Sequence, residues 1–215
     1  MPSSFQALDV RRGLPTISMF AVIGAVLAVL LSLLQPLRYS STARLLVQQQ
    51  LGVSVDAYTT SRSEERIADN LVTLLYTTTF FDQVMQAGFS IDQNTFPSGD
   101  RERRRAWQKA VDASVMRGTG VLTLTAYHQD VAQAEQLVRA VSQIFVQNVG
   151  QYTSGGNVTV RLIDAPLNSR FPVKPNFLIN AFSGFIIGLF GGVGFVLLKS
   201  ERIRRRHQIT HGGVG

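Results

Sequence analysis

An uncharged, glycine-rich stretch near the C-terminus decides the architecture: residues 177–198 read FLINAFSGFIIGLFGGVGFVLL. As a helix this stretch would extend about 33 Å, enough to cross a bilayer with some tilt. Gly184, Gly188 and Gly192 recur every four residues and so share one helical face. Because small residues at this spacing let helix backbones approach closely, we predict a packing face against another span or a second subunit. The alternative is the general glycine richness of membrane helices.

A second apolar stretch lies near the N-terminus. Residues 17–34 carry no charged side chain, and as a helix they would extend about 27 Å. A cleaved signal peptide is the alternative, since Arg11 and Arg12 precede the stretch, but its apolar part exceeds the roughly 7–15 residues of a signal core. We therefore predict an uncleaved span. Three alanines could supply small side chains opposite the glycines: Ala21, Ala25 and Ala28.

The distribution of charge predicts the orientation. The chain has 21 Lys and Arg against 14 Asp and Glu, a formal net charge of +7. Residues 1–16 carry a net +1 and residues 199–215 a net +4, whereas the much longer middle carries only +2. The positive-inside rule then places both termini in the cytoplasm. We expect the basic tail to contact anionic lipid headgroups rather than nucleic acid; its arginines are Arg202, Arg204, Arg205 and Arg206.

These features divide the chain into five predicted segments. They are a cytoplasmic N-terminus (1–16), a transmembrane helix (17–34), an extracytoplasmic α+β domain (35–176), a second transmembrane helix (177–198) and a basic cytoplasmic tail (199–215). The predicted fold class is thus an α+β domain between two transmembrane helices, in a hairpin topology. The chain has no cysteine, which excludes disulfides and thiolate chemistry.

The first half of the middle segment predicts one strand followed by helices. Alternation over residues 38–48 predicts a strand, and residues 49–60 a loop. The S-x-x-E pattern from Ser61 to Glu64 predicts a capping box that opens a helix. A short helix is expected to end near Gly88.

The second half predicts a hairpin, a long helix and a last strand. Alternation on both sides of a Gly-rich turn predicts the hairpin over residues 111–127. Asp130 is the expected N-cap of a helix that runs to about residue 149. Its predicted core stripe is Val131, Ala134, Val138, Val141 and Phe145. The strand over 157–164 should bury Val158, Val160 and Leu162.

Two local features bear on function. Residues 101–109 read RERRRAWQK, which indicates either a solvated helix face or a site for anions or nucleic acid; we favour the solvated face. Before the second apolar stretch, prolines hold the chain extended and predict a stiff connector. The connector residues are Pro166, Pro172, Lys174 and Pro175.

The sequence shows no pattern typical of catalysis. It has neither a phosphate-binding G-x-x-x-x-G-K-[ST] loop nor a G-x-S-x-G elbow. Its three histidines are His128, His207 and His211, and the i, i+4 pair in the tail has no carboxylate between its members. We therefore predict no enzyme activity, no catalytic residue, no metal site and no cofactor.

The order of several motifs resembles the Wzz-type polysaccharide co-polymerases, or chain-length determinant proteins, over nearly the whole chain. After the first span, RYSSTARLLV (38–47) is similar to the first strand of that family, and SEERIADNL (63–71) to its first helix. GVLTLT (120–125), followed by Asp130 and Ala134, resembles its hairpin strand and next helix. The most specific part is VRLIDAP (160–166), with Pro172, Lys174 and Pro175 before a Gly-rich span.

This resemblance implies a non-catalytic regulator in the bacterial plasma (inner) membrane. Such proteins form homo-oligomeric rings that set the length of O-antigen, capsule or exopolysaccharide chains made by a Wzy-type polymerase, so the growing polysaccharide is also an implied partner. The space between Gly88 and Val111 is too short for the long helical extension of many members. The tail has no tyrosine cluster and no kinase domain, which leaves open the activation of a separate cytoplasmic tyrosine kinase.

Two other functions stay open at this stage. The first is a membrane-anchored sensor or scaffold whose outer domain binds a ligand, although the short tail leaves little room for an output domain. The second is a membrane-bound enzyme acting on glycans, which would need paired carboxylates in a cleft. No feature of the sequence nominates such a pair.

Overall fold

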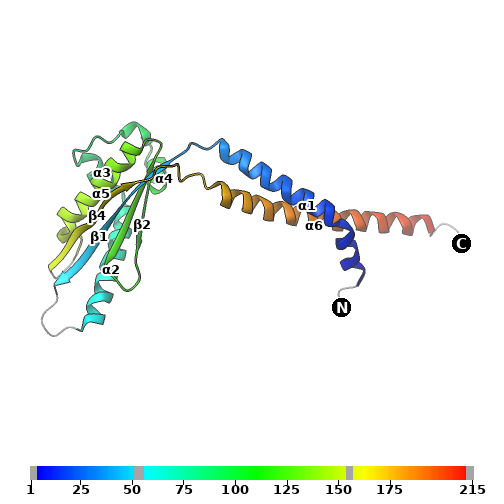
Figure 1. Cartoon of the computed structure of the whole chain (residues 1–215), viewed down its shortest axis with the longest axis horizontal. Helices are drawn as coiled ribbons and strands as arrows, with labels where there is room; N and C mark the ends of the chain where they lie inside the picture. Colours follow the sequence, from blue (N-terminus) through cyan, green and yellow to red (C-terminus); the bar gives the residue numbers. More distant parts are fainter. Residues whose placement is uncertain (1–3, 51–55, 154–156, 212–215) are drawn as a thin grey trace. The chain divides into compact units, whose positions relative to one another are not determined.

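The computed structural model describes the backbone of residues 4–50, 56–153 and 157–211, and the side chains of 13–49, 56–153 and 158–202. The chain divides into two compact units (Figure 1). One consists of Met1–Pro36 and Lys174–Gly215 and holds two long helices; the other, Leu37–Val173, holds a sheet with helices. The chain is therefore of mixed α+β class, as predicted at this level, with one apolar helix before the sheet-containing domain in the sequence and one after it.

The domain is built on a four-stranded antiparallel sheet in the order β2-β3-β1-β4. The strands are β1 (Tyr39–Gln50), β2 (Val111–Val115), β3 (Val121–His128) and β4 (Asn157–Asn168). Four α-helices connect them: α2 (Ala57–Leu75), α3 (Thr78–Gln86) and α4 (Asp100–Ala110) lie between β1 and β2, and α5 (Val131–Tyr152) lies between β3 and β4. A short 3-10 turn, η1 (Gln93–Thr95), precedes α4. This order is a split β-α-β arrangement.

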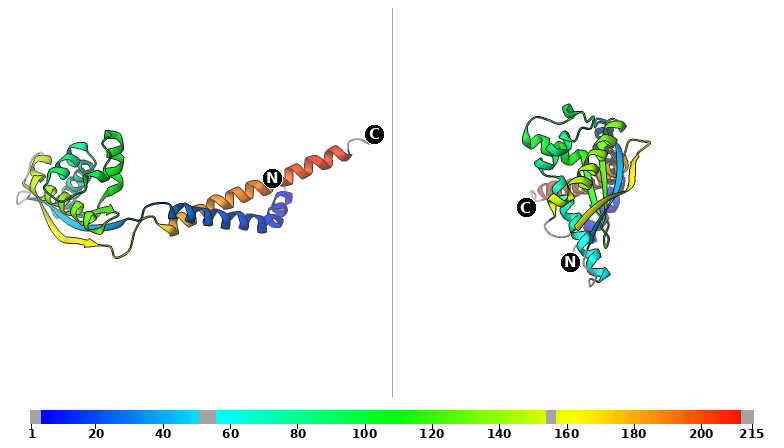
Figure 2. Two further views of the ribbon diagram at one scale, coloured as in Figure 1. Left: turned by 90° about the horizontal axis from the view of Figure 1, so that it is seen from above. Right: turned by 90° about the vertical axis from the view of Figure 1, so that its left-hand side faces the viewer.

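All four α-helices cover the same face of the sheet, as the left view of Figure 2 shows. The alternation predicted for β1 is confirmed, because Ala43, Leu45 and Val47 are buried in one core with residues of the helices. The opposite face is polar; on it the Thr42 and Thr125 hydroxyl groups lie 3.0 Å apart, across β1 and β3. Because one face of the sheet is covered and the other is open, buried and less buried side chains alternate along β1 and β3.

Helix α5 supplies the largest apolar surface to this core. Asp130 caps it by accepting a hydrogen bond from the Ala132 backbone N–H at 2.9 Å, as predicted. Of the predicted stripe Val131 is only half-buried, and the other four residues are fully buried: Ala134, Val138, Val141 and Phe145. The Phe145 ring also contacts that of Phe80 on α3, with centroids 4.8 Å apart.

The predicted capping box at Ser61 is wrong. Helix α2 begins at Ala57, inside the predicted loop, so Ser61 and Glu64 lie within the helix. Their side chains bind the backbone of other segments: Ser61 Oγ donates to the Gly118 carbonyl at 2.7 Å, and Glu64 Oε1 accepts from the Gln49 N–H at 3.1 Å. These polar groups fasten α2 to the sheet rather than open the helix, which the spacing alone does not distinguish.

The last strand differs from its prediction in two ways. It continues to Asn168 instead of ending at Asp164, and the register against β1 shifts between Thr42 and Leu45. Val158 and Val160 are buried as expected, but Leu162 is 47 % exposed. Because β4 is an edge strand, α5 covers it only in part, and a groove between α5 and β4 exposes Leu162. The same edge position tolerates Pro166 within the strand.

The charged stretch 101–109 forms helix α4 and is anchored by its tryptophan. Trp107 is 1 % exposed, and its Nε1–H donates to the Leu75 carbonyl at 2.7 Å. Its ring lies edge-on to Phe81, with centroids 5.2 Å apart. Arg103 pairs with Asp100 at 2.7 Å. The tryptophan therefore has a structural role, since it connects α4 to the end of α2.

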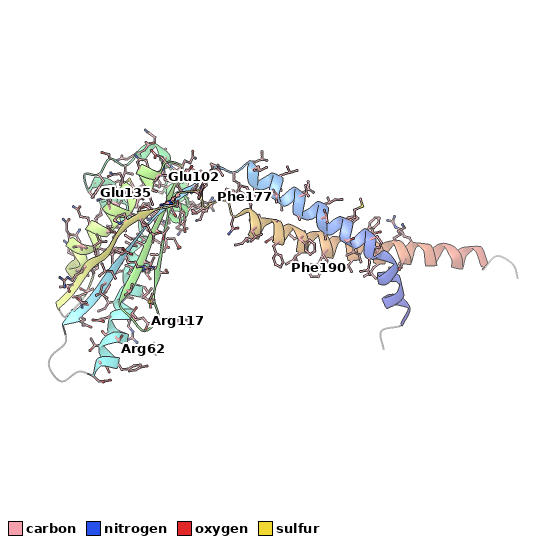
Figure 3. The ribbon with its side chains drawn as sticks, in the orientation of Figure 1. Arg62, Glu102, Arg117, Glu135, Phe177 and Phe190 are labelled. Carbon is pink, nitrogen blue, oxygen red and sulfur yellow. The ribbon has the colours of Figure 1, made fainter. Side chains whose placement is uncertain are left out.

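A polar contact joins α5 to the end of β4. Glu135 Oε2 accepts a hydrogen bond from Asn168 Nδ2 at 2.6 Å, and Glu135 Oε1 accepts from Arg139 at 2.6 and 2.8 Å (Glu135 is labelled in Figure 3). The Asn168 hydrogen bond, with a smaller contribution from Arg139, lowers the pKa of Glu135 below its ordinary value of 4.5. Hydrogen bonds to the charged form have this effect because they stabilise the carboxylate over the acid.

This contact predicts a component of acid sensitivity. A lowered pKa in the folded state adds stability above the ordinary value, which is lost as the pH falls through the folded value. We expect the free energy of unfolding of the full chain in detergent to fall between about pH 5 and pH 3, and to fall less in Glu135→Gln. Asn168→Ala, which removes the larger cause, should also flatten the profile. Denaturant titrations at several pH values measure this, and parallel profiles for all three proteins would contradict it.

Candidate functional site: the glycine-lined helix pair

The first unit consists of α1 (Ser4–Leu33) and α6 (Phe177–His211). Each contains a stretch long and apolar enough to cross a membrane, Gly13–Leu33 in α1 and Phe177–Arg202 in α6. Both stretches are mostly exposed; Phe190, for example, is 71 % exposed (Figure 3). Apolar helices with this much exposed surface are typical of contact with lipid.

The three regularly spaced glycines of α6 lie against α1. A methyl group at Gly184 would collide with the Gly24 carbonyl and come within 2.5 Å of the Ala28 methyl group. One at Gly188 would collide with the Phe20 carbonyl, and one at Gly192 would lie 2.9 Å from the Ile17 Cα. The absent side chains therefore allow the two backbones to touch, which is the contact that small residues provide between membrane helices.

The opposing surface on α1 is only partly the expected one. Among the three alanines, Ala21 and Ala28 approach the glycines directly. A further close contact comes from Gly24, since a methyl group there would collide with the Gly184 carbonyl. A single glycine shows no repeat, so its role could not be read from spacing.

A polar contact also joins the two helices. Asn180 Nδ2 donates to Ser32 Oγ at 2.7 Å, and Ser32 Oγ donates to the Ala28 carbonyl at 2.8 Å. Ser32 is only 2 % exposed. Hydrogen bonds of this kind between helices contribute about 0.6 kcal/mol on average in membranes, but they fix the register of the pair.

The predicted connector residues fall into different elements. Pro166 lies inside β4, and Pro172 follows the strand. Val173 N–H donates to the Arg38 carbonyl at 2.8 Å, which closes the end of the domain. The Lys174–Pro175 peptide bond is cis, and α6 begins at Phe177.

The basic tail continues helix α6. Arg202 is exposed, and the backbone at Arg204, Arg205 and Arg206 is helical, while the side chains of these three lie outside the described residues. The same holds for His207 and His211. Their predicted contacts with lipid or a partner stay predictions.

Three titratable side chains of the domain, Tyr76, Tyr127 and His128, contact neighbouring groups of the protein. Burial raises the pKa of both Tyr76 and Tyr127, and the negative charge of Asp112 raises both further. His128 Nδ1 accepts from the Asp130 N–H at 3.0 Å, and its Nε2 lies 3.2 Å from the Thr95 hydroxyl. Among the described residues no three His, Asp or Glu side chains gather as a metal site would require.

Comparisons with known proteins give no further assignment. No protein-family model matches the chain, and no curated protein matches it.

The glycine contacts predict a position-specific effect of added methyl groups. Gly184→Ala/Gly188→Ala should separate α1 from α6, because each methyl meets backbone; overpacking of this kind costs about 1–3 kcal/mol. Gly191→Ala/Gly194→Ala is the matched control, since nothing lies within 4 Å of a methyl group at either position.

A disulfide can report the distance between the helices. A Cβ at Gly13 would lie 3.2 Å from the Val196 Cβ, slightly less than the roughly 3.5–4.5 Å of a disulfide, and the chain has no cysteine of its own. Gly13→Cys/Val196→Cys should therefore cross-link under mild oxidation. We expect Gly184→Ala/Gly188→Ala to slow this reaction strongly and the control pair to leave it unchanged. Equal rates in both backgrounds would contradict the packing role.

Proposed function

We propose that this chain is a non-catalytic, two-pass regulator of polysaccharide chain length in the bacterial plasma membrane. It acts as a homo-oligomeric ring beside a Wzy-type polymerase and limits how far the growing O-antigen, capsule or exopolysaccharide chain extends. Both termini lie in the cytoplasm, and the α+β domain lies outside. The cytoplasmic tail is free to contact lipid or a separate tyrosine kinase.

One observation carries this proposal. The α+β domain begins and ends on two adjacent antiparallel strands, each of which leads directly to an apolar helix. The motifs that support the resemblance occupy matching elements: residues 38–47 enter β1, 63–71 lie in α2, 120–125 enter β3, and 160–166 lie in β4. This agreement between motif and element favours the chain-length regulators over an unrelated two-span protein.

The edge of the sheet supports self-association. Among the described residues β4 pairs with β1 alone, which makes it an edge strand. Apolar side chains are exposed along it, with Ile163 at 52 % and Leu167 at 75 %. A second copy of the chain is the cover that the proposed ring would supply for this edge.

The proposed topology can be tested by single-cysteine labelling. Because the chain has no cysteine, Ser98→Cys in the outer domain and Val214→Cys in the tail each provide one reactive site. In intact spheroplasts, an impermeant maleimide should label Ser98→Cys and leave Val214→Cys unlabelled until the membrane is opened. The reverse pattern would exclude the proposed orientation.

The proposed function can be tested on the polymer itself. We expect deletion of the gene to shift the modal length of surface or secreted polysaccharide, or to remove long chains, and the restored gene to reverse this. Gel separation of the polysaccharide measures the distribution. Gly184→Ala/Gly188→Ala should complement poorly, while Gly191→Ala/Gly194→Ala should complement fully. An unchanged length and amount after deletion would exclude this role for that polymer and favour a sensor or scaffold.

A further inference from the structure

A basic hollow lies within the α+β domain. It has a volume of about 320 Å³ and opens between α4, the loop after η1 and the ends of β1 and β3. One water molecule needs only about 10–15 Å³, so the hollow holds a group of several heavy atoms. Phe96, Pro97 and Ala106 give it an apolar wall.

Three cations face this hollow from two elements. Arg105 and Lys109 stand one turn apart on α4 and therefore share a helix face, and Arg38 comes from the residue before β1. Arg38 also donates to the Lys109 carbonyl at 3.3 Å, which ties the two elements together. In the sequence these residues are 67 and 71 positions apart from Arg38, so only the fold gathers them.

Two of these cations have no carboxylate partner among the described residues. Arg103 on the same helix pairs with Asp100, and Arg104 donates to the Thr78 hydroxyl at 3.1 Å. Arg105 and Lys109 form no ion pair within the portion of the chain described. Their charges are thus available to an anion, whereas the other side of α4 is used for folding.

The remaining polar groups define the charge of the site. His128 Nδ1 accepts the Asp130 N–H at 3.0 Å, and its Nε2 lies 3.2 Å from Thr95 Oγ1, so both ring nitrogens face groups of the protein. Glu102, labelled in Figure 3, adds one negative charge beside the three cations. The three cations outweigh this carboxylate, so the hollow favours an anion, and hydroxyl groups of that anion could donate hydrogen bonds to Glu102.

These features match a phosphodiester that carries a hydroxylated headgroup. Arg binds phosphate oxygens through its planar fork, and Lys adds a point charge. The apolar wall suits the carbon atoms of the ester. Arg38 follows the last residue of α1 by five residues, a length of backbone that spans at most about 18 Å. If α1 spans the membrane, lipid headgroups are therefore the phosphodiesters nearest to Arg38.

We propose that this hollow, formed by Arg38, Arg105, Lys109 and Glu102, binds the headgroup of an anionic glycerophospholipid of the phosphatidylglycerol type. This inference rests on the two-pass topology proposed above but not on the polysaccharide role. The bound lipid would hold the α4 side of the domain at the outer membrane surface.

The test compares variants of equal charge. Purified full-length protein in neutral detergent is titrated with short-chain phosphatidylglycerol, and binding is followed by the fluorescence of Trp107, the only tryptophan, which lies beside Phe96 of the hollow. Arg105→Gln/Lys109→Gln should weaken binding about tenfold or more. Arg101→Gln/Arg117→Gln removes the same charge from exposed positions outside the hollow and should change it less than about twofold.

Further ligands and a variant of opposite effect complete the test. Short-chain phosphatidylcholine, which has no hydroxyl group and no net charge, should bind weakly, and so should inorganic phosphate and glycerol phosphate.

Glu102→Gln should tighten phosphatidylglycerol binding several-fold, because it removes a repulsion and keeps an acceptor. Equal binding of free phosphate would overturn the lipid assignment, and equal losses in both double variants would overturn the site. Since the readout is lipid binding, a negative result here leaves the chain-length experiment unaffected.

Discussion

The antiparallel pairing of β1 with β4 is the constraint on which the rest of the structure depends. These are the first and last strands of the domain, and their ladder runs from Ser41 opposite Asn168 to Gln50 opposite Asn157. Two backbone contacts extend it, from the Ser169 N–H to the Ser40 carbonyl and from the Val173 N–H to the Arg38 carbonyl. The chain therefore enters and leaves the domain at one end of the sheet. This agrees with the helix pair, in which the end of α1 and the start of α6 contact each other through Ser32 and Asn180.

Local patterns predicted most of the domain, since the sheet has one covered and one open face. Alternation identified β1 and the hairpin, and a capping residue with a stripe of apolar positions identified α5. The errors arose where a side chain serves another segment. Ser61 and Glu64 bind the hairpin turn and β1 rather than the start of their own helix. The exposure of Leu162 depends on how far α5 covers the edge strand, which no local pattern records.

In the helix pair and the basic hollow, too, patterns of neighbouring residues could be predicted from the sequence, whereas contacts between distant residues could not. Regular spacing revealed the glycine face of α6, but left its partner open between the first span and another subunit. Gly24 and the Ser32–Asn180 hydrogen bond were missed, because one is a single residue and the other joins positions 148 residues apart. The charged run in α4 was visible in the sequence, but the different roles of its cations follow only from the fold. Arg103 pairs with Asp100 and Arg104 donates to Thr78. Arg105 and Lys109 face the hollow.

The β1–β4 pairing also has a mechanical consequence. A force that spread the two apolar helices would pull the start of β1 and the end of β4 apart from the same end of the sheet. The hydrogen bonds of the ladder lie perpendicular to the strands, so this force acts along them and breaks them one after another. A force parallel to the strands would instead load all of these hydrogen bonds together. The register shift between Thr42 and Leu45 lies near the loaded end and interrupts the ladder there. The domain therefore resists separation of α1 from α6 only weakly, and it resists sliding of β1 along β4 strongly.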